Sequence, residues 1–283
     1  MISRLRWRKL VSNIMLTMTG VCAVVTVSVL FLILGYLVFH GGTSVSWNFF
    51  TKLPAPVGEA GGGMANAIVG SAKLLLLATL VGVPIGFFGA IYLAEFSGTR
   101  TAFIVRYAAD LLNGVPSIVI GIFAYSLVVL PFKHFSTFAG GFALGVMMIP
   151  ITLRSTEEFL RSVPNTLREG AMALGASKWK AIATVIVPCA YRGILTAVLL
   201  AFARVAGETA PLLFTALGNR FWSPGWNQPT SSLPVVIYNY AISPYEDWHR
   251  QAWAAGLVLL GLILVINIVA RGVLARGTSV SRS

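Results

Sequence analysis

The chain has 283 residues, of which 57% are hydrophobic and only 11% are charged. Soluble domains carry about 25% charged residues, so this composition leaves too few charges to cover a soluble surface. The net charge of +12 would suit a nucleic-acid ligand, but the positive residues lie in clusters between long uncharged runs. The composition therefore predicts an integral membrane protein.

Uncharged runs of membrane-spanning length occur five times. A helix needs about 20 mostly apolar residues to cross the hydrocarbon core. The runs are Ser12–Phe39, Leu74–Ala94, Leu111–Phe132, Phe135–Leu153 and Gln251–Ala270. A sixth run, Gly193–Asn219, has the length but contains Arg204 and Glu208. We therefore predict an all-α polytopic membrane protein with six transmembrane helices.

The first run is predicted to be a retained helix rather than a cleaved signal peptide. Basic residues precede it as in a signal, at Arg4, Arg6, Arg8 and Lys9. However, the run is much longer than the usual apolar region of about 7–15 residues, and no small-x-small cleavage site closes it before Phe39.

The positive residues are distributed unequally when six helices are threaded with the N-terminus inside. Fifteen of the 21 Lys and Arg then fall on the inner side, two fall within spans, and the outer side receives Lys52, Lys133, Arg220 and Arg250. This is the positive-inside pattern. Both termini are predicted to be cytoplasmic, and the basic charge reports topology rather than a nucleic-acid partner.

No cofactor, metal site or disulfide is expected. Cys22 lies inside the first run and Cys189 on the cytoplasmic side, so the two thiols cannot readily meet. His40, His134 and His249 are scattered near the outer face, and no Cys/His cluster has metal-ligand spacing.

Small residues and prolines within the runs predict how the helices pack. Four-residue spacing of small residues allows close helix contacts in lipid, and it occurs at Gly82/Gly86, Gly141/Gly145 and Ala252/Gly256. Pro84 and Pro116 should kink or locally unwind their spans. The outer segment 218–250 is rich in Trp and Tyr, which favours an interfacial belt over a docking surface.

The longest cytoplasmic connection, residues 154–192, predicts a short amphipathic helix of about two turns. Asn165 is the expected N-cap, and Gly175 is the expected C-terminal residue in the left-handed conformation. Leu167, Ala171 and Leu174 would share one face. Such a helix suits a groove on a soluble partner, although a solvated loop with one helical turn fits the pattern equally well.

Residues 169–188 resemble the E-A-A-x3-G-x9-I-x-L-P signature of bacterial ABC importer permeases. The matching residues are Glu169-Gly170-Ala171, Gly175 and Val185-Ile186-Val187-Pro188. In that family the segment is the coupling helix that docks onto the ATPase, so the resemblance assigns Glu169, Ala171 and Gly175 to ATPase coupling. Gly170-x4-Gly175 also begins like a phosphate-binding loop, but Ala176-Ser177 stands where Lys-Ser/Thr is required.

Arg204 and Glu208 are four residues apart in the middle of the sixth run, which predicts that they share one helix face. A charge at that depth costs at least about 2.5–3.5 kcal/mol, so it should be paired or face water. The pair could therefore be purely structural, or it could line a pathway in which Arg204 meets a passing anion. We favour the pathway.

The stretch Ala203–Leu212 reads A-R-V-A-G-E-T-A-P-L and resembles the A-R-x-x-G-E-T-A-P-L stretch of PstA-type permeases of phosphate ABC importers. Together with shorter matches, such as Gly114-Val-Pro116-Ser117, the resemblance covers roughly residues 60–217. We therefore predict Arg204, Glu208 and Thr209 as translocation-pathway residues. Lys73 departs from the family pattern and is expected to extend to the membrane interface.

The resemblance implies a type I ABC importer permease core of five helices at residues 64–275, with the coupling segment at 154–191. Residues 1–63 would form the N-terminus, first helix and external loop, and 276–283 a cytoplasmic tail. The chain would be a non-enzymatic permease subunit in the bacterial plasma (inner) membrane with phosphate as its substrate. Its implied partners are a homologous PstC-like permease, a PstB-like ATPase dimer and a PstS-like phosphate-binding protein.

Two other functions remain compatible with parts of the sequence. A permease for another oxyanion, such as molybdate or sulfate, would share the fold, but the Gly207-Glu208-Thr209-Ala210-Pro211 stretch argues against it. An ion-driven secondary transporter could use Arg204 and Glu208 as a proton relay. The coupling signature argues against that alternative.

Overall fold

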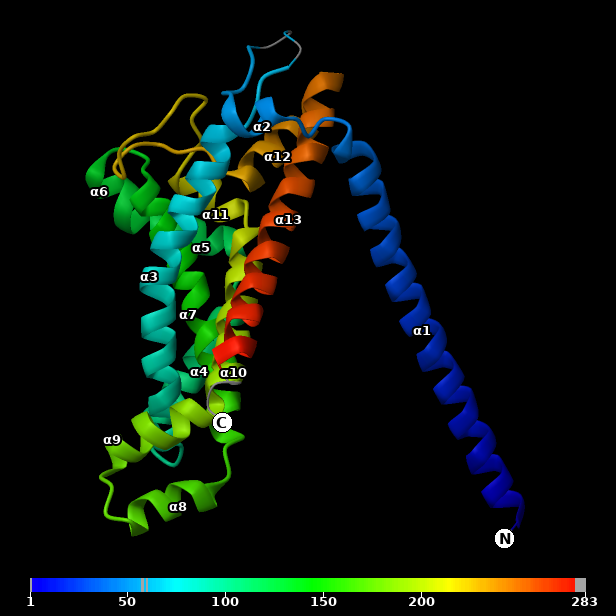
Figure 1. Ribbon diagram of the computed structural model, residues 1–283, viewed down its shortest axis with the longest axis vertical. Coiled ribbons are helices and arrows are strands. Elements are labelled where there is room, and N and C mark those ends of the chain that lie inside the picture. The colour runs from blue at the N-terminus through cyan, green and yellow to red at the C-terminus, as the bar shows by residue number, and fades with distance from the viewer. Residues whose placement is uncertain (1, 57–58, 60, 278–283) are drawn as a thin grey trace.

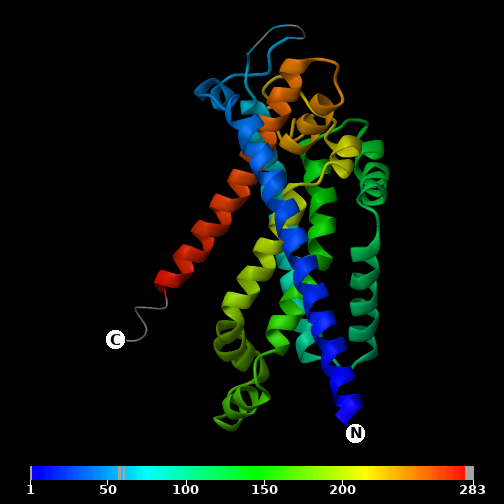
Figure 2. The same ribbon diagram turned by 90° about the vertical axis from the view of Figure 1, so that its right-hand side faces the viewer.

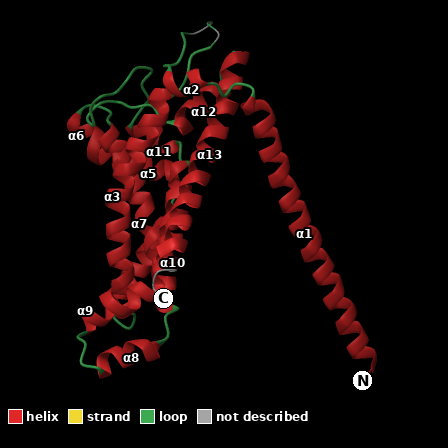
Figure 3. Cartoon of the chain, in the orientation of Figure 1, coloured by secondary structure: helices red, strands yellow, loops and turns green. Residues whose placement is uncertain are grey.

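The computed structural model describes residues 2–56, 59 and 61–277, and this part of the chain folds into helices and loops without a β-strand (Figure 1 and Figure 3). Five helices are long and apolar enough to span a membrane, or six when one bent pair counts as a single span. The all-α class is confirmed. Of the predicted tail, residues 278–283 lie outside the described residues, whereas 276 and 277 belong to the last helix.

Four of the spans are unbroken helices, namely α1 (Ile2–Gly42), α3 (Ala65–Glu95), α7 (Thr137–Arg161) and α13 (Glu246–Gly277). Apolar runs form helices because a backbone in hydrocarbon must satisfy its own hydrogen bonds. α3 continues through Pro84 as one helix, so local unwinding, one of the two effects predicted there, is not observed. Two short helices, α2 (Trp47–Thr51) and α12 (Leu233–Ala241), lie at the loop end of the molecule where α1 joins the body (Figure 1).

The third span is broken, as expected from Pro116, and it begins at Arg100 rather than at the predicted Leu111. α4 (Arg100–Gly114) meets α5 (Ser117–Ala124) at an angle of 104°. The path then continues through the π-helical turn η1 (Tyr125–Val129) into α6 (Leu130–Phe132). Pro116 causes the break because it lacks an N–H and excludes the helical conformation from the residue before it. The predicted effect of Pro116 is confirmed.

The fifth span is one continuous helical path from Lys178 to Ala206, which corrects the predicted run Gly193–Asn219. The helical path begins at α9 (Lys178–Ala181), passes through the π-helical turn η2 (Ile182–Ile186) and ends with α10 (Val187–Ala206). A separate short helix, α11 (Ala210–Thr215), follows after three residues. Pro211 explains the interruption, since its ring would clash with the carbonyl of residue 207 in a continuous helix.

α3 and α7 form the centre of the body and pack closely along glycines. A Cβ added at Gly82 would lie 2.6 Å from the Met148 Cβ, and one at Gly141 would lie 2.4 Å from the Leu77 Cβ. These distances leave room only for hydrogen, so the two helices approach more closely than larger residues would permit. The predicted packing role of the Gly82/Gly86 and Gly141/Gly145 spacings is confirmed.

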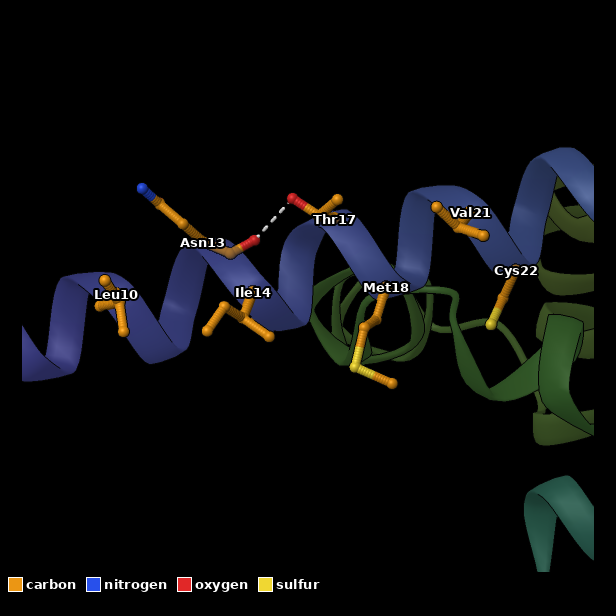
Figure 4. Close-up of a pocket in the computed structure, with 7 residues that line it drawn as sticks. All are labelled: Leu10, Asn13, Ile14, Thr17, Met18, Val21 and Cys22. Carbon is orange, nitrogen blue, oxygen red and sulfur yellow. Dashed lines mark hydrogen bonds between the residues drawn. The ribbon is translucent and has the colours of Figure 1, made fainter.

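α1 stands apart from the body and contacts it at one end only (Figure 1), and in the view turned by 90° it crosses in front of the body (Figure 2). There Tyr36 packs edge-on against Trp253 of α13, and a Cβ at Gly41 would lie 2.7 Å from the Trp253 carbonyl oxygen. A shallow hollow of about 470 Å³ beside α1 is lined only by residues of this one helix (Figure 4). This hollow is therefore a helix surface rather than a ligand cavity.

Polar residues early in α3 bind the loop between α11 and α12. Lys73 Nζ donates to the Ser223 carbonyl at 2.6 Å, and Asn66 Nδ2 donates to the Asn219 carbonyl at 2.7 Å. These bonds explain why α3 begins nine residues before the apolar run that starts at Leu74. Lys73 thus anchors this loop through its ammonium group.

Candidate translocation site and coupling segment

The two helix breaks lie close together, and the residues at the breaks themselves are exposed or half-buried. α5 lies directly on α11, because a Cβ added at Gly121 would be only 2.7 Å from the Pro211 Cα. Ile120, Val205 and Leu212, which flank the breaks, belong to one buried cluster, together with residues of α3 and α7. Broken backbone at membrane depth is tolerated where it is buried in protein or lines a water-filled cavity. Two breaks at one place therefore mark a candidate translocation site.

The three predicted pathway residues lie at the break between α10 and α11. Arg204 is in the last turn of α10 and is exposed, whereas Glu208 and Thr209 follow the helix end and are half-buried. The prediction that Arg204 and Glu208 share one helix face is wrong, since α10 ends at Ala206. No ion pair joins the two charges within the described part of the chain.

This arrangement changes what Arg204 can do chemically. A guanidinium presents five N–H donors and stays charged at every physiological pH, which suits an oxyanion. Because Arg204 is exposed and unpaired with Glu208, its charge is available to a ligand, to water or to a partner subunit rather than neutralised within α10. Helix ends beside a break in membrane helices likewise provide polar groups to ions in transit.

A second charged cluster, which the sequence did not predict, joins α4 to α7. Glu157 is only 1% exposed and accepts hydrogen bonds from Arg106 Nη2 at 2.5 Å and Arg154 Nη1 at 2.6 Å. Arg154 Nε also lies 2.7 Å from Asp110, and Arg161 Nη1 lies 3.5 Å from Glu157. The spacing of 154, 157 and 161 on α7 is visible in sequence, but the partners on α4 are not.

This cluster explains why α4 extends to Arg100 through charged residues. The sequence-based boundary at Leu111 treated Arg106 and Asp110 as residues outside the membrane span. Both side chains instead find opposite charges on α7, so the charged half of α4 is helical and packs on the body.

The predicted cytoplasmic helix is α8 (Asn165–Ala173), and its C-terminal end matches the expectation. Gly175 has φ +84°, its N–H donates to the Met172 carbonyl, and the Ala176 N–H donates to the Ala171 carbonyl. This pair of bonds is the Schellman motif, which favours glycine. The predicted N-cap is wrong by one residue. Pro164 occupies the N-cap position and makes no side-chain cap bond, and Asn165 is the first residue of the helix.

α8 lies at one end of the molecule (Figure 1). Both apolar and polar side chains of this helix are exposed. Leu174 is 90% exposed, and Leu167, Met172 and Trp179 are also exposed. Glu169 and Gly175 are exposed, whereas Ala171 is half-buried. The segment therefore presents an apolar surface at an aqueous end of the protein, which favours contact with a partner over a solvated loop.

The fold and this site define a membrane transport component, and comparisons with known proteins specify the family. Residues 82–277 match the family model described as binding-protein-dependent transport system inner membrane component. The chain belongs to this family, in its PstA branch. It is 43% identical over 272 residues to the phosphate transport system permease protein PstA of Yersinia pestis, covering 95% of this chain and 92% of the relative.

Other comparisons agree with this assignment. The PstA protein of Haemophilus influenzae is 45% identical over 270 residues, with 95% of each chain covered. Among solved structures, the chain resembles the inward-facing MetNI methionine ABC transporter with a TM-score of 0.60, at 16% identity, covering 75% of this chain and 96% of that one. This likeness supports the ABC importer permease fold.

Replacing Glu157 by Gln should destabilise the protein, because Arg106 and Arg154 would lose their buried counter-charge. Breaking a buried ion pair typically costs about 3–5 kcal/mol. The neighbouring Glu158 is exposed, so Glu158→Gln is the matched control and should leave stability nearly unchanged. The measurement is the melting temperature of the detergent-purified protein, and equal melting temperatures for the two variants would contradict the assigned role of Glu157.

Proposed function

We propose that this chain is one of two membrane permease subunits of an ATP-driven phosphate importer. The observation that carries the proposal is the identity of 43–45% to phosphate transport permeases over nearly the whole chain. The placement of Arg204 at a break between two membrane helices supports it. Phosphate would move past this break as the importer alternates between its two accessible states.

Arg204, Glu208 and Thr209 are the residues that we propose for the pathway. Arg204 would attract the phosphate anion, and Thr209 offers a hydroxyl that both donates and accepts hydrogen bonds. Glu208, a half-buried carboxylate beside the path, would repel the anion and so prevent it from binding too tightly. An importer needs this balance, because binding must be strong enough for entry and weak enough for release.

The energy for transport would come from a separate ATPase subunit that docks on α8. Glu169, Ala171 and Gly175 are the proposed coupling residues, and the exposed Leu174 and Met172 would add apolar contact area. The partners would be a homologous PstC-like permease, a PstB-like ATPase dimer and an external PstS-like phosphate-binding protein. In this arrangement α8 and both chain termini would lie in the cytoplasm of a bacterial cell.

Replacing Arg204 by Gln should reduce phosphate uptake by about tenfold or more, since a hydrogen bond to a charged group contributes about 1.5–3 kcal/mol. Arg204→Lys keeps a cation without the guanidinium fork and should give intermediate uptake. Arg271→Gln removes an exposed cation from α13 and serves as the control. The measurement is radiolabelled phosphate uptake by the complete importer at matched membrane levels. Normal uptake by Arg204→Gln would refute the pathway role.

Replacing Gly175 by Val should lower uptake while ATP hydrolysis by the assembled importer continues. A β-branched residue at φ +84° is strained by about 1–2 kcal/mol, so the Schellman end of α8 would shift. Gly175→Asn should be milder, because Asn tolerates this conformation. Gly170→Ala is the control, because Gly170 lies within α8 and a Cβ added there would have no neighbouring atom within 4 Å. If Gly175→Val transports as much phosphate per ATP as Gly170→Ala, the helix end has no role in coupling.

A further inference from the structure

The end of α3 holds the coupling segment through a nearly buried ion pair. Nη1 of Arg168, in α8, lies 3.0 Å from Oε1 of Glu95, the last residue of α3. The two side chains are only 16% and 9% exposed. Removing one charge of such a pair leaves the other buried without compensation, so the contact strongly fixes how the two helices sit.

This contact depends on charge rather than on a hydrogen bond. Oε1 of Glu95 accepts no hydrogen bond within the described residues, despite its close approach to Arg168. The guanidinium is oriented by a different bond, in which Arg168 Nη2 donates to the Leu160 carbonyl at 2.8 Å. Leu160 lies in the last turn of α7. Arg168 therefore bridges the ends of α3 and α7.

A second cation reaches the same place from beyond the Gly175 turn. Lys178, the first residue of α9, donates from Nζ to the Glu95 carbonyl at 3.1 Å and lies 3.9 Å from the centroid of the Phe96 ring. Arg168 and Lys178, which lie on either side of the Gly175 turn, thus contact the same group of atoms. We call this group, formed by Glu95, Phe96 and the Leu160 carbonyl, the Glu95 seat.

The helices that carry the seat also support the two helix breaks. α3 and α7 are in close contact along their glycines, which leaves little room for one helix to shift against the other. Leu74 of α3 and Met148 of α7 share a buried cluster with Val205 and Leu212, which flank the break between α10 and α11. A displacement delivered to the seat would therefore reach the break through packed side chains, which transmit strain with little compression.

We propose that the Glu95 seat transmits the movement of the coupling segment to the α3–α7 pair, with Arg168 and Lys178 as positioning residues. This inference rests on the proposed function, because it requires an ATPase that moves α8. The covalent chain from α9 through η2 into α10 offers another route to the break. The seat adds a direct route to α3. Substitutions at the seat interrupt only this direct route, so they distinguish it from the route through the covalent chain.

The test measures phosphate transported per ATP hydrolysed in proteoliposomes that hold the complete importer. Arg168→Gln and Glu95→Gln should each lower this ratio by about fivefold or more, the lower end of ordinary coupling between sites, while ATP hydrolysis persists. Both changes remove the ion pair, and Arg168→Gln also removes the bond to the Leu160 carbonyl. The double variant should therefore lie within about twofold of Arg168→Gln rather than at the product of the two losses. Arg168→Lys retains the positive charge, so its ratio of phosphate transported to ATP hydrolysed should lie between those of Arg168→Gln and the unaltered protein.

Lys180→Gln is the matched control, because it removes an exposed cation from α9 that makes no contact with the seat. Three outcomes would overturn the inference: an unchanged ratio in the single variants, independent and multiplying losses in the double variant, or an equal loss in the control. A purely structural role would lower assembly and hydrolysis together and leave the ratio unchanged.

A cysteine at Ala171 tests the proposed function separately from the seat. In the otherwise unaltered importer this cysteine should crosslink to the ATPase subunit. Failure to crosslink would contradict ATPase docking on α8. A crosslink together with unchanged ratios in the seat variants would overturn only the inference about Glu95 and Arg168.

Discussion

The architecture depends on one constraint, which is that a backbone inside a membrane must satisfy its polar groups without water. Five spans meet this constraint as continuous helical paths. The remaining span is broken at Pro116, and Pro211 separates α11 from the end of the fifth span. The two breaks lie close together because Gly121 has no side chain to separate α5 from α11. The contact between α5 and α11 holds the two breaks together, while the residues at the breaks and the neighbouring Arg204 stay exposed or half-buried.

The same helices connect this site to the aqueous end that carries α8. α3 runs from the loop held by Lys73 and Asn66 to the ion pair between Glu95 and Arg168. α7 runs parallel to it in space, and its Glu157 binds the charged half of α4. Each end of the central helix pair is therefore fastened by polar contacts, while its middle is packed by glycines and apolar side chains. Such a pair suits a rigid element that moves as one body.

Local patterns in the sequence were sufficient to predict the helical class, the spans of α1, α7 and α13, and the left-handed end at Gly175. They failed where a distant partner decides the structure. α4 contains charges that α7 neutralises, and α3 begins with polar residues that bind a loop about 150 positions away. The ion pair between Arg168 and Glu95 is equally non-local. The break after Ala206 had a local signal in Gly207 and Pro211, but the apolar run around it favoured a continuous span.

The central claim, that the break after α10 lines a water-filled phosphate path, is tested most directly by chemical labelling of Thr209→Cys. Cys22 and Cys189 are first replaced by Ser, and the complete importer is treated with a small water-soluble thiol reagent. The account predicts rapid labelling that slows when phosphate is transported, compared with slow labelling of Ile268→Cys on the exposed apolar surface of α13. Labelling of Thr209→Cys no faster than Ile268→Cys, or unaffected by phosphate, would contradict it.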